Sequence, residues 1–73
     1  MKITLHEELV DILRHRGGGW MTTQELAEQV QKRGTYKKRD GTSDVSAFQV
    51  HGRTRQYPGL FERDGSRVRL RER

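Results

Sequence analysis

The chain has 73 residues, the size of one small domain, which leaves little room for a catalytic pocket that excludes water. It contains no cysteine, which excludes disulfides and thiolate zinc sites, and no apolar run as long as a signal-peptide core or a membrane span. Residues 1–31 carry three basic and five acidic side chains and residues 32–73 carry twelve and five, so the net charge of +5 comes from the second half and favours a polyanionic partner.

The first predicted element is a helix from Thr4 to Arg16. Thr4 and Glu7 have the spacing of a capping box, in which each side chain accepts a hydrogen bond from the other residue's backbone N–H. The apolar residues that follow recur on one helical face: Leu5, Leu9, Ile12 and Leu13. We expect the helix to end at Gly17–Gly19, because glycine adopts the positive φ of a helix C-cap without steric cost. This glycine run lacks the pattern of a phosphate-binding loop.

A second helix is predicted after Thr22, which has capping-box spacing with Glu25. Met21 can pack on Leu26 across this helix start as a hydrophobic staple. Trp20 and Met21 form a short extended step before the helix, and we expect Trp20 to pack between the first helix and the C-terminal hairpin. The inward face of the second helix carries Leu26, Ala27 and Val30.

Gly34 is placed to end the second helix, and the segment TYKKRDGTS at 35–43 is predicted to be a loop. Asp40-Gly41 is a typical turn pair within it. The loop is basic because it contains Lys37, Lys38 and Arg39. We expect these cations to contact phosphates at the edge of a nucleic-acid footprint, and the alternative is a solubilising surface.

A third helix is predicted over residues 45–57, capped by Ser43 or Asp44 and ended by Tyr57-Pro58-Gly59. At about 100° per residue its side chains separate into two arcs. The arc expected to face the core contains Ala47, Phe48, Val50, His51 and Thr54. The opposite, polar arc contains Ser46, Gln49, Arg53 and Gln56.

The C-terminal segment LFERDGSRVRLRER predicts a β-hairpin with its turn at Asp64-Gly65. A two-residue turn there sets Phe61 opposite Val68 and Glu62 opposite Arg67. Val68 and Leu70 alternate with arginines, so one face can pack on the helices while the other presents guanidinium groups. These arginines are Arg67, Arg69 and Arg71.

Three short helices followed by a hairpin predict a winged-helix domain of the helix-turn-helix class, mainly α with a small β-hairpin. We expect residues 1–73 to form one such domain. The runs WMTTQELAEQVQKRGTYKKRDGT, VSAFQV and YPGLFERDGSRVRLR resemble the HARE-HTH family, most specifically at 21–27, 32–36 and the closing hairpin. Many members have a longer, proline-containing segment where this chain enters the third helix directly through residues 40–44.

The resemblance implies DNA binding, in a family found beside restriction enzymes and chromatin factors and in a bacterial RNA polymerase subunit. It also suggests a link to modified or methylated DNA. Several similar domains act as protein-docking modules, so the fold alone does not decide the function.

The polar arc of the third helix supplies the candidate base-reading residues. Arginine pairs with guanine and glutamine with adenine in a major groove, which makes Gln49, Arg53 and Gln56 suitable. Ser46 could hold a phosphate at the helix start. The hairpin arginines would contact phosphates together with the basic loop, although Arg67 can pair with Glu62. Arg55 could bond helix-end carbonyls or reach a phosphate.

No metal or catalytic pattern competes with this interpretation. The histidines His6, His15 and His51 lack metal-ligand spacing, and no nucleophile motif surrounds the serines. We therefore expect no enzyme activity and no cofactor.

The prediction is a monomeric, cytoplasmic, nucleoid-associated module for double-stranded DNA, without a membrane, acting in transcription regulation or restriction-modification. The rival is a protein-docking domain that uses the side of Phe48, His51 and Arg55, or its acidic first half, to hold a polymerase or nuclease. RNA binding is a weaker alternative, because no stacking aromatics stand on a sheet or loop.

Overall fold

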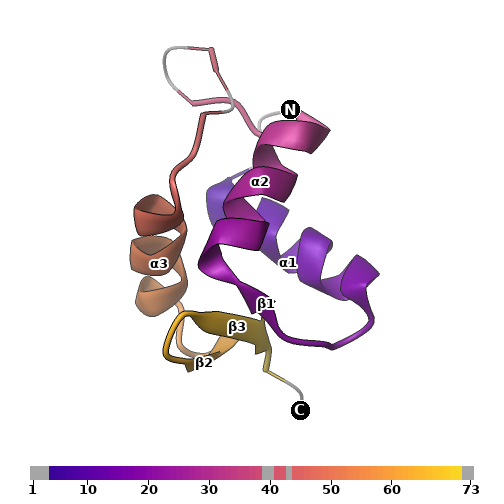
Figure 1. Cartoon of the computed structure of the whole chain (residues 1–73), viewed down its shortest axis with the longest axis vertical. Helices are drawn as coiled ribbons and strands as arrows, with labels where there is room; N and C mark the ends of the chain where they lie inside the picture. Colours follow the sequence, from indigo (N-terminus) through magenta and orange to yellow (C-terminus); the bar gives the residue numbers. More distant parts are fainter. Residues whose placement is uncertain (1–3, 39–40, 43, 72–73) are drawn as a thin grey trace.

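The computed structural model describes residues 4–38, 41–42 and 44–71, in which three helices lie above a small antiparallel sheet (Figure 1). The elements in chain order are α1 (Leu5–Arg16), β1 (Met21–Thr22), α2 (Thr23–Arg33), α3 (Ala47–Gln56), β2 (Phe61–Asp64) and β3 (Arg67–Leu70). This confirms the predicted class, mainly α with a β-hairpin in the layout of a winged helix. Arg39, Asp40 and Ser43 lie outside the described residues.

Both predicted capping boxes are present. The Thr4 hydroxyl accepts from the Glu7 N–H at 3.3 Å while the Glu7 carboxylate accepts from the Thr4 N–H at 2.9 Å. Thr22 and Glu25 exchange the same two bonds at 3.1 and 2.8 Å. Each pair satisfies two N–H groups that a helix start otherwise leaves without partners. The predicted ends are also confirmed, because Gly17 and Gly34 cap α1 and α2 at φ values of 85° and 64°.

The start of α3 differs from the prediction. Asp44 does not cap the helix, and Ser46 is the N-cap instead. The Ser46 hydroxyl accepts from the Gln49 N–H at 3.2 Å, and the Gln49 side-chain oxygen accepts from the Ser46 N–H at 2.9 Å. This reciprocal pair starts the helix at Ala47 and leaves Val45, which precedes the cap, buried in the core.

The hairpin register is shifted by two residues from the prediction. Asp64 pairs with Arg67 across the turn, so the turn residues are Gly65 and Ser66 and not Asp64 and Gly65. Gly65 has a φ of 64°, which glycine tolerates, and an ion pair of 2.6 Å joins Asp64 to Arg67 beside it. Because side chains alternate with a period of two, this shift leaves each of them on its predicted face.

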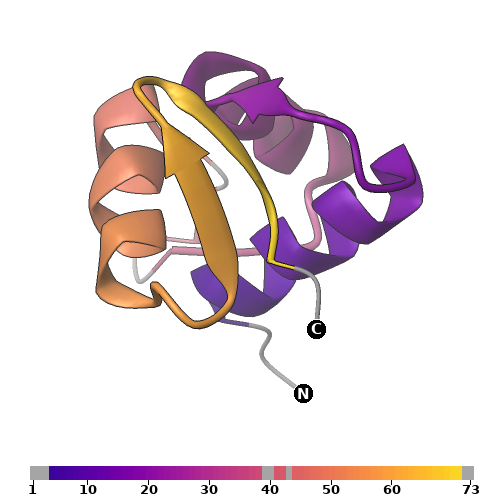
Figure 2. The same cartoon turned by 90° about the horizontal axis from the view of Figure 1, so that it is seen from below.

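The predicted extended step is a third strand of the sheet. β1 pairs with β3 through Met21 opposite Val68 and Thr22 opposite Arg67, which gives the strand order β1-β3-β2 (Figure 2). The sheet closes one end of a core whose fully or almost fully buried apolar side chains include Leu9, Leu13, Leu26, Val30, Val45, Val50, Phe61 and Val68. None of the described helices is long and apolar enough to cross a membrane.

A charged cluster joins α1 to α2 away from α3. The Arg33 guanidinium donates to the Asp11 carboxylate, and it also lies 3.8 Å from Glu8, which is fully buried. The hydrogen bond from Arg33 is the main reason that the pKa of Asp11 lies below its ordinary value. These contacts leave the outer side of α3 as a separate surface.

Candidate nucleic-acid interface

The orientation of α3 decides which side chains could touch a partner. Val50 and Thr54 are fully buried, and α3 packs chiefly against α2. Phe48 is 85% exposed, so the prediction that it faces the core is wrong. The core is occupied at this level by Val45 from before the helix and by Phe61 from β2, and the helix is rotated so that its buried side centres on Val50 and Thr54.

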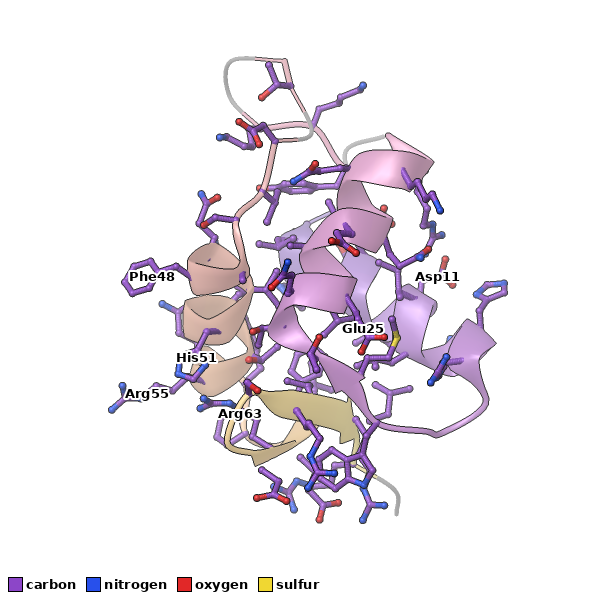
Figure 3. All side chains as sticks on the ribbon, in the orientation of Figure 1. Asp11, Glu25, Phe48, His51, Arg55 and Arg63 are labelled. Carbon is purple, nitrogen blue, oxygen red and sulfur yellow. The ribbon has the colours of Figure 1, made fainter. Side chains whose placement is uncertain are left out.

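The fully solvent-facing side of α3 therefore differs in part from the predicted polar arc. Its exposed residues are Phe48, Gln49, Gly52, Arg55 and Gln56. Arg53, which the sequence placed in the centre of the polar arc, is half-buried, and Arg55 is exposed. Figure 3 shows Phe48 and Arg55 projecting from α3 away from the other helices.

Ser46 and Gln49 are both exposed but are engaged with each other at the helix start. A glutamine contacts adenine through its amide oxygen and nitrogen together, and here the Gln49 oxygen already accepts from the Ser46 N–H. Bidentate base contact by Gln49 would therefore cost α3 part of its cap. Gln56, in the last turn, has no such role in capping the helix.

The two arginines of α3 have no internal partner in the described part of the chain. Neither Arg53 nor Arg55 forms a side-chain hydrogen bond or ion pair within residues 4–38, 41–42 and 44–71, so Arg55 does not bond the helix-end carbonyls there. The helix AFQVHGRTRQ also contains no carboxylate. The outer side of α3 is thus cationic and available to an anionic partner.

The hairpin arginines, in contrast, all have internal partners. Arg67 pairs with Asp64 at 2.6 Å, and Arg71 donates to the Pro58 carbonyl at 2.8 Å. Arg69 pairs with Glu62 at 3.1 Å, so the prediction that Glu62 pairs with Arg67 is wrong and follows from the shifted register. The Arg69 hydrogen bond is the main cause that lowers the pKa of Glu62.

Trp20 lies against two of these arginines. The guanidinium carbons of Arg69 and Arg67 lie 4.5 and 5.5 Å from the centre of the Trp20 ring, within the range of cation–π attraction. Because Trp20 precedes β1, which pairs with β3, the sheet register brings the ring beside the hairpin. The ring thus holds the two guanidinium groups on the outer face of the sheet.

The basic loop is partly described. Lys37 is exposed, whereas Lys38 is half-buried and its ammonium group donates to the Asp44 carbonyl at 2.8 Å. Backbone bonds from Lys38 to Thr42 and from Gly41 to Lys38, at 2.7 and 2.9 Å, close a turn. The third loop cation, Arg39, lies outside the described residues. Figure 1 shows this loop at one end of α3 and the hairpin at the other.

One contact between α3 and the sheet was missed in the sequence. Arg63 of β2 lies with its Nη2 2.7 and 2.9 Å from the two ring nitrogens of His51 (Figure 3). The only sequence signal was that Arg63 alternates with the inward-facing Phe61. No described group of three or more histidine, aspartate or glutamate side chains is arranged to hold a metal ion.

A family model shares the pattern of this fold. The HARE-HTH model, whose description names an HTH domain of ASXL proteins and restriction endonucleases, matches residues 3–72. No curated protein and no solved structure matches the chain.

Proposed function

Because the chain belongs to the HARE-HTH family of helix-turn-helix domains, we propose that it is a single, monomeric module that binds double-stranded DNA and has no chemistry of its own. α3 enters the major groove, and the basic loop and hairpin lie on the phosphate backbone. The observation that carries this proposal is the outer side of α3, which has two arginines without partners among the described residues and no carboxylate.

The dimensions and position of α3 support its role as the reading helix. A major groove is about 12 Å wide and admits one α-helix. α3 lies at the edge of the molecule with its outer side uncovered (Figure 1). Arg53, Arg55 and Gln56 supply donors of the kind that read guanine and adenine edges, and the Ser46 end of the helix can face a phosphate.

The phosphate contacts would come from both ends of α3. Lys37 and Lys38 lie in the loop before the helix, with Arg39 next in sequence, and the hairpin arginines lie beyond its other end. The hairpin arginines already have internal acceptors, so they would have to share or exchange a partner to reach a phosphate. These are Arg67, Arg69 and Arg71. We therefore assign the larger share of the electrostatic attraction to α3 and the loop.

A titration of labelled duplex DNA at several salt concentrations tests this proposal. Each phosphate that the protein neutralises should add about −0.9 to the slope of log affinity against log salt. We expect a slope steeper than about −3, from at least Lys37, Arg53 and Arg55 together with one hairpin arginine. Absence of binding at low salt, or binding that does not depend on salt, would contradict it.

The second candidate function is protein docking, and the exposure of Phe48 favours it. A polymerase or nuclease bound through Phe48, His51 and Arg55 would bury an apolar contact and depend weakly on salt. The salt titration separates the two candidates. The proposed biological setting is cytoplasmic, at the nucleoid, in transcription regulation, restriction or the recognition of modified DNA.

A further inference from the structure

Phe48 is the one large apolar side chain that is exposed among the residues the structure describes. It is the second residue of α3, and Figure 3 shows it directed away from the body of the molecule. Single exposed apolar residues are common on protein surfaces, so this exposure acquires meaning only from the residues on the same side of the helix.

Gly52 lies one turn after Phe48 on that side. A Cβ atom at Gly52 would meet nothing within 4 Å, and no positive φ requires glycine there. Glycine is the least favourable residue after proline in a helix interior, so the fold itself gains nothing from it. A bare backbone at the centre of an exposed helical face does, however, let a partner approach more closely than any side chain would.

Arg55 completes the same side of α3, three residues after Gly52 and seven after Phe48. The strip formed by Phe48, Gly52 and Arg55 is thus apolar at one end, bare in the middle and cationic at the other. A stable protein interface buries about 800 Å² on each partner, with an apolar core depleted of charge. One phenylalanine on a helix with two arginines and no carboxylate fits an anionic, grooved partner better.

In a DNA major groove, the apolar group that a phenylalanine can contact is the 5-methyl group of thymine. We propose that Phe48, with the bare backbone at Gly52 beside it, forms a seat for a thymine methyl group, while Arg55 contacts the neighbouring base or phosphate. This inference rests on the proposed function, because it requires α3 in the major groove. It adds a base preference at a residue that was expected to lie in the core.

Replacing thymine by uracil removes only the methyl group and therefore tests the seat directly. A preferred site is first selected from a random duplex library, and each thymine is then replaced singly and the affinity measured at one salt concentration. We expect the replacement at one or two positions to weaken binding about fourfold, the value for losing one buried methyl-sized group. Phe48→Ala should bind the thymine and uracil duplexes equally, and Phe48→Leu should keep the preference.

Gly52→Ala supplies a variant whose folding cannot explain its loss of binding. Since the Cβ meets no atom, the substitution should raise the Tm by a few degrees, roughly 4 °C, while it weakens binding to the selected site several-fold. Gly59→Ala is the matched control, because Gly59 also has open space around it and lies outside α3. It should leave binding unchanged.

The outcomes separate this inference from the proposed function. Steep salt dependence with no effect of uracil at any position overturns the thymine seat and leaves DNA binding intact. A Phe48→Ala variant that retains the thymine preference, or a Gly52→Ala variant with full affinity, also overturns the seat. Absence of duplex binding at low salt overturns both.

Discussion

The guanidinium group of Arg63 lies 2.7 Å from Nε2 of His51, and this contact joins β2 to the middle of α3. Arg63 stands opposite Val68, at an inward-facing strand position where an apolar side chain is usual. Its Nε is buried without a hydrogen-bond partner within the described part of the chain. The arginine is therefore kept at this position by its bond to His51, which holds α3 against the sheet.

Arg63→Met removes this bond and keeps an unbranched apolar side chain in its place. We expect the free energy of unfolding to fall by about 1–2 kcal/mol, because hydrogen bonds to charged groups contribute about 1.5–3 kcal/mol and the methionine retains some packing. Arg67→Met is the control, since its ion pair with Asp64 is exposed and should contribute at most about 0.5 kcal/mol. Urea denaturation measures both, and equal small losses would show that the His51 contact does not stabilise the domain.

Ser46→Ala tests where α3 begins. Removing the hydroxyl leaves the Gln49 N–H without its acceptor and should lower the free energy of unfolding by about 1 kcal/mol. Asp44→Ala should change it by only a few tenths of a kcal/mol, because Asp44 does not cap the helix. The reverse order of the two losses in thermal or urea denaturation would place the helix start at Asp44.

Stability should fall with acid over a defined range. Hydrogen bonds from the Thr22 backbone and from Arg33 lower the folded-state pKa values of Glu25 and Asp11 below their ordinary values of 4.5 and 3.8. Groups with lowered pKa values stabilise the fold above the unfolded-state pKa, and this contribution disappears as the pH falls through the folded-state value. We expect the Tm to drop below about pH 4.5 and the drop to be smaller in Glu25→Gln, whose amide keeps the cap without titrating. An unchanged pH profile in that variant would contradict the assignment.

Arg53 and Lys37 should affect DNA binding in different ways. Arg53→Ala removes a base-reading group, which costs about 1–3 kcal/mol on a selected site and reduces the preference at one base pair. Lys37→Ala removes a phosphate contact, so it should weaken all duplexes alike and make the salt slope shallower by about one. Both variants are titrated on the selected site and on a scrambled duplex at matched salt. Equal losses on both duplexes would show that α3 supplies charge without reading sequence.

The local features of this fold were predictable from the sequence. The capping boxes at Thr4 and Thr22 and the glycine caps at Gly17 and Gly34 depend on residues three or four positions apart, so each can be identified from a short segment. The start of α3 had the same kind of signal in Ser46 and Gln49. It was missed because Ser43 and Asp44 precede the apolar residues of the helix and also suit a cap.

The features that failed depend on contacts between distant segments. Helical periodicity separates two faces of α3 but does not say how the helix is rotated against α2, and this rotation exposes Phe48. Asp64-Gly65 and Gly65-Ser66 are both acceptable hairpin turns, so the pairing of β3 with β1 and β2 was needed to choose between them. The contact between His51 and Arg63 spans 12 residues and has no local pattern.

The most direct test of DNA contact by α3 is a map of amide chemical-shift changes along the ¹⁵N-labelled chain during titration with duplex DNA at low and at high salt. The account predicts the largest changes at Phe48, Gly52, Arg55 and Gln56, smaller ones at Lys37 and along β3, almost none in α1, and a general reduction at high salt. Changes concentrated in α1, or confined to the hairpin with α3 unaffected, would contradict it.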